Sequence, residues 1–410
     1  MPTDIVFSHK LSFPIGLFLI SILLIGGPLA AQAPTQAAKP TFSLGGMIAC
    51  TAQARLDVFQ PFFSARFLPK LDFSLPAGRG WTFDGEASAN LFGALGFPRH
   101  ETAMASGDIK PYRGWLRLSS SRFEARLGLQ QLNFGSATLF RPLMWFDSID
   151  PRDPLQLTDG VYGLLLRFYA KGNANAWVWG LYGNSERRGF DAVPPDKKSP
   201  EFGGRIELPL FKGEIAATYH HRKADIGVLV PFMSPLASPA SALPPASPLP
   251  VPAVPEDRFG VDGKWDLGIG LWFEGAIVHQ LSGYPSVHFQ RSCTLGADYT
   301  FAVGRGLTVL AEHFRIDSAV RAFSSGNGRS FSALLLRYPI GLLDELSGIF
   351  YYDWTDRGVY RFFGWTRRTD TITFSAIAFW NPAGTVLFQG LAGSGSFAGT
   401  GIELILAYNF

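Results

Sequence analysis

The chain has 410 residues, of which 47% are hydrophobic and only 17% charged, and its formal net charge is +3. So small an excess of positive charge argues against nucleic acid as a partner. The length would suit two or three soluble domains, but it also suits one large barrel. The 45 glycines and an aromatic fraction of 14% are typical of a barrel whose wall crosses a membrane, where aromatic girdles lie at the interfaces.

The N-terminal segment has the pattern of an export signal. Lys10 precedes a mostly apolar run over residues 11–25, and Ala31-Gln32-Ala33 then supplies a small-residue cleavage site. We expect residues 1–33 to be a signal peptide and residues 34–410 to be the mature protein. No later segment has about 18 unbroken apolar residues, so no transmembrane helix is expected.

From residue 41 onward, apolar and polar side chains alternate with the two-residue period of a strand, which predicts an all-β fold. About eighteen strands are predicted, or sixteen or fourteen if weak runs merge. The predicted strands are 41–56, 63–75, 80–94, 109–119, 122–134, 160–169, 174–183, 201–208, 213–222, 257–267, 270–281, 289–301, 306–317, 328–338, 346–353, 358–366, 369–381 and 400–410.

The connections between these strands alternate between brief and long. This is the pattern of an antiparallel transmembrane β-barrel with short periplasmic turns and long extracellular loops. Its outward face must be apolar because it meets lipid, while the inward face can be polar. The proline-rich segment 223–256 cannot join a ladder and is predicted to be an extracellular loop. The long connections are 95–108, 135–159, 184–200, 223–256 and 382–399.

The last eleven residues form one alternating run that ends on an aromatic residue. Ile402, Leu404, Leu406, Tyr408 and Phe410 share one face of the predicted strand. This ending resembles the closing strand of bacterial outer-membrane β-barrels. The resemblance implies that Tyr408 and Phe410 form an assembly signal read by the barrel-assembly machinery, and that the protein resides in the lipid of the cell outer membrane.

A second resemblance lies within residues 126–160, which read RLGLQQLNFGSATLFRPLMWFDSIDPRDPLQLTDG. The segment is similar to a signature of porin-like outer-membrane barrels, in which a Gly-Arg-Gln strand leads to Trp-Gly and then to a loop with repeated Asp-Pro. It departs from that pattern at Leu129, where the family has Arg, and at Phe134, where it has Trp. The resemblance implies a channel through which small polar solutes pass passively.

The loop 135–159 is rich in apolar side chains, which need somewhere to pack, and the lumen wall is the nearest place. We therefore predict a constriction loop whose aspartates face arginines of the wall, creating a transverse field that filters dipolar solutes. The alternative is a surface cap whose aspartates only cap turns around Pro151 and Pro154. The predicted aspartates are Asp147, Asp150 and Asp153, and the predicted arginines are Arg113, Arg117, Arg126 and Arg167.

Acidic residues of the inward face occur mainly on the later strands, at Glu274, Asp298 and Glu312. With the arginines concentrated on earlier strands, a modest leaning towards anionic or polar solutes is expected. The alternative is that these charges pair with one another and merely fill a polar interior.

Two rival functions remain open at this stage, an outer-membrane hydrolase that uses wall residues and a plugged structural or adhesive surface barrel. No Gly-x-Ser-x-Gly motif is present. His220 and His221 are neighbours on a predicted strand, so they point to opposite faces and cannot easily bind one metal. We expect no catalytic residue, no metal and no cofactor, and the oligomeric state is not predicted.

Overall fold

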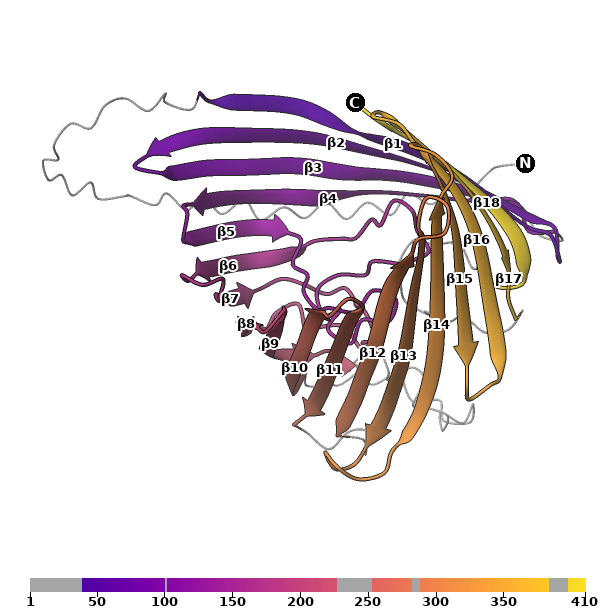
Figure 1. Cartoon of the computed structure of the whole chain (residues 1–410). Coiled ribbons are helices and arrows are strands. Elements are labelled where there is room, and N and C mark those ends of the chain that lie inside the picture. Colours follow the sequence, from indigo (N-terminus) through magenta and orange to yellow (C-terminus); the bar gives the residue numbers. More distant parts are fainter. Residues whose placement is uncertain (1–38, 100–101, 227–252, 282–287, 383–396) are drawn as a thin grey trace, which may run out of the picture.

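The computed structural model describes residues 39–99, 102–226, 253–281, 288–382 and 397–410, and its strands form one sheet (Figure 1). The predicted signal peptide and most of the proline-rich loop lie outside the described residues. The strands are β1 (Thr41–Arg55), β2 (Gln60–Gly78), β3 (Trp81–Gly96), β4 (Met104–Ser119), β5 (Phe123–Gln130), β6 (Val161–Tyr169), β7 (Asn175–Leu181), β8 (Glu201–Leu210), β9 (Gly213–Ala224), β10 (Val254–Asp266), β11 (Gly270–Gln280), β12 (Phe289–Phe301), β13 (Leu307–Ala319), β14 (Asn327–Pro339), β15 (Asp344–Asp353), β16 (Gly358–Arg368), β17 (Ile372–Trp380) and β18 (Thr400–Asn409).

The sheet closes on itself. Each strand pairs antiparallel with its neighbours in the sequence, and β1 pairs with β18 from Met47 opposite Asn409 to Arg55 opposite Gly401. Closure removes the two free edges, so each wall strand has a hydrogen-bonding partner on both sides, as a sheet in lipid requires. The prediction of an all-β, antiparallel barrel of about eighteen strands is confirmed: the described residues form 18.

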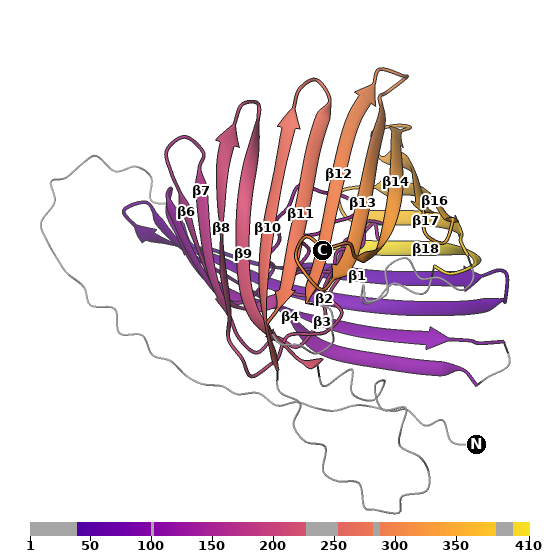
Figure 2. The same ribbon diagram turned by 90° about the horizontal axis from the view of Figure 1, so that it is seen from below.

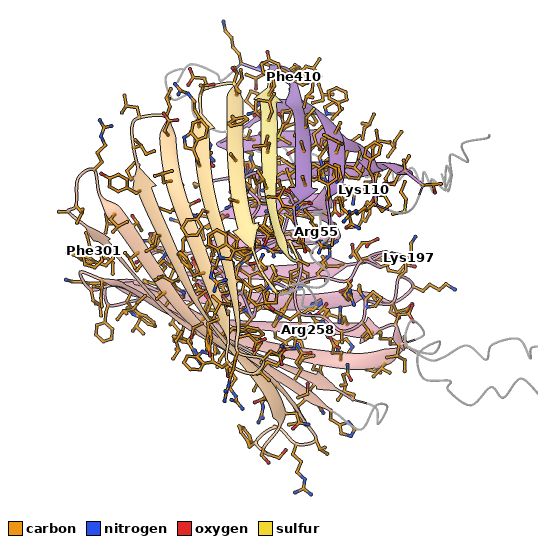
Figure 3. All side chains as sticks on the ribbon, turned by 90° about the vertical axis from the view of Figure 1, so that its right-hand side faces the viewer. Arg55, Lys110, Lys197, Arg258, Phe301 and Phe410 are labelled. Carbon is orange, nitrogen blue, oxygen red and sulfur yellow. The ribbon has the colours of Figure 1, made fainter. Side chains whose placement is uncertain are left out.

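The two ends of the barrel differ in the length of their connections. One end carries the brief turns, such as residues 79–80 and 211–212, and the other carries the long connections. Figure 3 shows Phe301, the last residue of β12, at the short-turn end, and Lys197 among the long loops at the opposite end. The predicted alternation of brief and long connections is therefore confirmed. The described residues include no helix with the length and apolar character needed to cross a membrane.

The alternation along each strand sorts side chains between two environments. On β18, Leu404 and Leu406 point outward and are 42% and 51% exposed, whereas Ile405 between them points inward and is 3% exposed. The same outward apolar pattern recurs at Ile206 on β8 and Leu295 on β12. An apolar outer face around a closed sheet is what a lipid environment demands, because a charged side chain at mid-bilayer costs about 2–4 kcal/mol.

Several strand ends differ from the sequence prediction. The strand β5 ends at Gln130 and not at residue 134, because Leu132 and Phe134 leave the wall and are buried inside the barrel. The strand β4 begins at Met104, five residues earlier than predicted, because it continues to pair with the extended β3. The proline-rich connection is shorter than predicted at both ends, since β9 runs to Ala224 and β10 begins at Val254.

A β-bulge in β4 changes which side chains enter the lumen. Ser88 of β3 lies opposite Arg113, but Ala89 lies opposite Pro111, so Tyr112 is an extra residue. A bulge shifts the inward and outward phase of a strand by one residue. From Arg113 to the end of β4, the odd-numbered residues therefore face inward. Before the bulge, even-numbered residues such as Lys110 face inward instead.

Candidate functional site

The connection between β5 and β6, residues 131–160, folds back into the barrel. Figures 1 and 2 show this magenta segment running through the space that the strands enclose. Its large side chains are buried: Leu139 is 3% exposed, and Phe140 and Leu143 are each 1% exposed. The loop therefore lies in the lumen rather than over the barrel mouth, as the constriction-loop hypothesis requires.

One group of loop side chains packs against the later strands. Phe140 stacks on Phe314 of β13 with ring centroids 5.1 Å apart and meets Tyr351 of β15 edge to face at 5.4 Å. Leu139 belongs to the same cluster. The inner wall is apolar where it receives this part of the loop, because its cluster members are Trp272, Leu310, Phe314, Ala333, Leu335, Ile349, Tyr351, Tyr360, Phe362 and Phe379.

A second group packs against the earlier strands. Phe134 stacks on Trp179 of β7 at 5.7 Å and contacts Trp145 and Phe146 of the loop edge to face. Val161 and Leu165 of β6 complete this cluster. Burying a side chain of this size stabilises its position by about 1.5–3 kcal/mol relative to leaving it in water. The loop is thus held on two sides of the lumen.

Buried carboxylates of the wall bind the loop backbone. Glu312 of β13 accepts hydrogen bonds from the backbone N–H groups of Thr138, Leu139 and Phe140 at 2.7, 2.9 and 2.7 Å. The indole N–H of Trp272 donates to the same carboxylate at 3.0 Å. Successive backbone N–H groups that converge on one anion form a nest, so this strand residue supplies the anion for a nest made by the loop.

Glu274 of β11 binds the loop in the same way. Its carboxylate accepts the N–H groups of Ala137 and Leu143 at 2.9 and 2.5 Å. The hydroxyl of Thr294 donates to the carbonyl of Phe140 at 2.7 Å. Glu274 and Glu312, two of the three inward-facing acidic residues predicted on the later strands, therefore bind the loop backbone.

Two arginines secure the other end of the loop. Arg188, in the connection between β7 and β8, donates to the carbonyl oxygens of Phe146 at 3.0 Å and Gly160 at 2.8 Å. Arg113 of β4 donates to the carbonyl of Thr158 at 2.9 Å. The second long connection thus braces the first, and Arg113 acts on the loop backbone rather than on a loop aspartate.

The three predicted loop aspartates have different surroundings. Asp147 is 1% exposed and forms an ion pair with Arg141 of the same loop at 2.8 Å. Asp150 pairs with Arg152 at 2.6 Å, again within the loop. Asp153 accepts the backbone N–H of Leu155 and forms no ion pair with a described residue. The structure does not pair these aspartates with the four wall arginines of the sequence hypothesis.

The other wall arginines pair with wall carboxylates. Arg117 binds Asp84 of β3 at 2.9 Å, and Arg126 binds Glu124 of β5 at 2.9 Å. Arg167 lies 3.9 Å from the same Glu124. The alternative that these charges largely compensate one another is thereby favoured for Arg117, Arg126 and Arg167.

Even so, this arginine cluster keeps unused donors. The Nε atoms of Arg126 and Arg167 and the indole nitrogen of Trp177 are buried and make no hydrogen bond. Arg167 lies over the Trp177 ring at 4.0 Å from its centroid, and the two residues are opposite each other on β6 and β7.

An open space remains between the loop and the wall formed by β18 and β1–β4. This cavity of about 290 Å³ is lined by both charged and apolar groups. Asp153 and Asp159 of the loop, Glu403 of β18, Arg66 of β2 and Lys110 of β4 all line it. Lys110 pairs with Asp159 at 2.6 Å. The cavity therefore lies on the side of the lumen that the two packed clusters leave open.

The surroundings of Asp153 in the cavity shift its pKa. Burial raises the pKa of Asp153 above its ordinary value, and the nearby charge of Asp150 raises it further. Hydrogen bonds from the backbone and the positive charge of Arg66 act in the opposite direction. The carboxyl of Asp153 therefore loses its charge at a higher pH than an exposed aspartate does.

The remaining predicted residues lie away from the cavity. Asp298 lies at the short-turn end, in a separate polar depression with Lys264 and Glu214. His220 points inward, where the Trp179 indole donates to it and Glu201 lies 3.2 Å from its Nε2. In the part of the chain that the structure describes, no cluster of His, Cys, Asp and Glu side chains has the arrangement of a metal site.

Comparison with known proteins gives matches by structure only. No family model matches the chain, and no curated protein sequence matches it. OccK5 (OpdH) of Pseudomonas aeruginosa is 12% identical, with a TM-score of 0.53 over 90% of this chain and 97% of that chain. The outer membrane channel DcaP of Acinetobacter baumannii is 13% identical, with a TM-score of 0.48 over 93% of this chain and 100% of that chain. An anion-selective porin from Comamonas acidovorans is also 13% identical, with a TM-score of 0.46 over 91% and 100% of the two chains. The match to OccK5 shows that the two proteins share the closed β-barrel fold.

Replacing Glu312 with alanine should release the loop from the wall. Three buried backbone N–H groups would lose their acceptor, and each unsatisfied group costs about 1–3 kcal/mol. We expect hydrogen exchange at the amides of residues 138–140 to accelerate about tenfold or more, while the amides of β13 stay protected. Glu345→Ala, at an exposed position, is the matched control. Equal exchange rates in Glu312→Ala and the wild type would contradict the anchoring role.

Proposed function

We propose that the protein is an outer-membrane channel through which small polar solutes diffuse passively. The observation that carries the proposal is the cavity between the inserted loop and the wall of β18 and β1–β4, lined by charges of both signs. A loop that narrows a water-filled barrel and places opposed charges at its aperture orients and filters dipolar solutes. The closed sheet and its apolar outer face support a position in lipid.

The leaning towards anionic solutes is part of the proposal. It is supported by the cluster on β3–β6, in which Arg117, Arg126 and Arg167 pair with only two carboxylates, those of Asp84 and Glu124. The excess positive charge of this cluster would attract a carboxylate or phosphate group of a solute in the lumen. The net positive charge of the whole chain adds only weakly to this preference.

Export and assembly follow the same proposal. Residues 1–33 would direct the chain out of the cytoplasm, and the barrel-assembly machinery would read Tyr408 and Phe410. The Phe410 ring stacks on Phe67 of β2 at 6.1 Å and on Tyr408 at 6.3 Å, on the outer surface of the seam. Exposed aromatic side chains at the β1–β18 seam offer a surface that an assembly factor can bind before these two strands pair.

The two rival functions have less support. A wall hydrolase would need a catalytic group that reaches solvent, but His220 is 1% exposed and does not line the cavity. A plugged structural barrel would need the loop to fill the lumen, whereas the cavity persists beside the loop. The channel function is therefore the one that the geometry supports best.

Purified protein inserted into a planar lipid bilayer should produce stable, open single-channel steps in KCl. The physical reason is the cavity, lined in part by charged side chains, that the loop leaves beside β18 and β1–β4. Heat-unfolded protein serves as the control for leaks caused by adsorbed chain. A folded, inserted barrel without conductance would contradict the proposal and favour the plugged barrel, and hydrolysis of added lipid or peptide would favour the enzyme.

Asp153→Asn should lower the ratio of K⁺ to Cl⁻ permeability, read from the reversal potential in a KCl gradient. Asp153 lines the cavity and has no ion-pair partner among the described residues. Asp147→Asn is the matched control, because Asp147 pairs with Arg141 and does not line the cavity. A shift of equal size in both variants would contradict the assignment of Asp153 to the passage.

The same recording, repeated at lower pH, should show a change of the permeability ratio in a defined direction. Since the pKa of Asp153 is raised by burial, acidification neutralises this carboxylate at a pH above the ordinary aspartate value of about 3.9. The wild-type permeability ratio should therefore fall in this pH range. Asp150, Glu403 and Arg66 face Asp153 and also set its titration. The Asp153→Asn channel should lack this step.

A further inference from the structure

The side of the cavity formed by β18 holds two carboxylates that form no ion pair with a described residue. Glu403 of β18 and Asp153 of the loop both line the cavity. They are near enough for their charges to act on each other, and Asp150 also acts on Glu403. The charge of Asp150, however, is compensated by its ion pair with Arg152 at 2.6 Å. Two acidic groups therefore remain at this position.

Glu403 is the more unusual of the two. It is 6% exposed, it points into the cavity, and no described residue donates a hydrogen bond to it or forms an ion pair with it. Gln53 lies directly opposite on β1 but does not donate to Glu403, because its Nε2 is also buried without a hydrogen-bond partner. A buried carboxylate is stable only when it is paired and hydrogen-bonded, so this position lacks a donor.

The nearby arginine does not supply the missing donor for the Glu403 carboxylate. Arg66 lines the same cavity, but its guanidinium lies over the Phe92 ring, 5.1 Å from the centroid, and forms no ion pair with a described residue. Asp153 receives only backbone N–H groups, from Leu155 at 2.8 Å and from Leu157. The two carboxylates together offer several free acceptor atoms and, among the described residues, no charged donor.

The geometry favours an organic cation over a metal ion. A divalent metal needs several oxygen ligands in a fixed arrangement, and the described residues contain no group of three or more acidic, His or Cys side chains so arranged. An ammonium group needs only two or three acceptors. Leu155, Ile405 and Phe397 line the cavity beside the carboxylates and offer apolar surface to an alkyl chain.

We propose that Glu403 and Asp153 form a subsite that binds the ammonium head of a small primary alkylamine solute in the lumen. As a statement about transported solutes, the inference rests on the proposed channel function. As a binding site, it stands on the unpaired buried carboxylate alone. A solute with an ammonium group at this subsite could place an anionic group elsewhere in the lumen, where the arginine cluster has free donors.

Binding is tested by calorimetric titration of butylammonium chloride into the folded barrel in detergent. About pH 8 is suitable, since an alkylammonium resembles lysine, with a pKa of about 10.4, and stays charged. Wild-type protein should bind the probe, and Glu403→Gln should raise the dissociation constant about tenfold or more, the effect of losing one charged hydrogen bond. Asp153→Asn, in the loop, carries the same test if Glu403→Gln does not fold.

Three controls make the result specific. Asp370→Asn, at an exposed turn, changes the net charge by the same amount and should bind as the wild type does. Butan-1-ol should not bind, because it lacks the charge. Wild-type affinity in both Glu403→Gln and Asp153→Asn, equal binding of butan-1-ol, or binding of CaCl₂ in place of butylammonium would overturn the proposal.

KCl conductance of the same preparation separates the two proposals. A conducting barrel that does not bind butylammonium keeps the channel function and refutes the subsite. A non-conducting barrel that binds butylammonium, and loses the binding in Glu403→Gln, keeps the subsite and refutes the channel.

Discussion

The closed hydrogen-bonded sheet is the constraint on which the rest of this structure depends. Because β1 pairs with β18, every strand has two neighbours, and each wall side chain can face only the outside or the lumen. In lipid the outside must be apolar. The polar and charged side chains of the strands are therefore concentrated in the lumen, where they must pair with one another, bind the inserted loop or meet a solute.

The lumen divides these roles between its sides. The inner wall of β11 and β13–β17 is largely apolar where it receives Leu139 and Phe140, and Glu274 and Glu312 reach out of that wall to bind the loop backbone. The arginines of β4–β6 form a compensated cluster with a few free donors. The loop leaves a cavity beside the wall of β18 and β1–β4, where Arg113 and Lys110 of β4 still bind its C-terminal end. One loop, packed against two sides of the lumen, thus leaves a cavity on the third.

Much of this fold could be predicted from the sequence, because the two-residue period is a local signal. All eighteen strands and the alternation of brief and long connections follow from it. The packing of the loop 135–159 inside the barrel could be foreseen from its apolar side chains, which need a place to pack. Its partners could not, because Glu274 and Glu312 bind backbone N–H groups, which every sequence possesses. The pairing of Asp147 with Arg141 was equally hidden, since only the folded loop brings these residues together. Tyr112 in the bulge and the isolation of Glu403 likewise depend on register and neighbouring strands.

The most direct test of the account is an accessibility scan with spin labels along β8 in lipid vesicles. Single cysteines at Phe202, Ile206 and Leu208, on the outward face, should give labels that are relaxed by lipid-soluble oxygen. Labels at Arg205 and Glu207, on the inward face, should respond to a water-soluble nickel complex instead. The account predicts this strict alternation of two residues. Accessibility to the nickel complex at all five positions, with no alternation, would contradict a wall that separates lipid from a watery lumen.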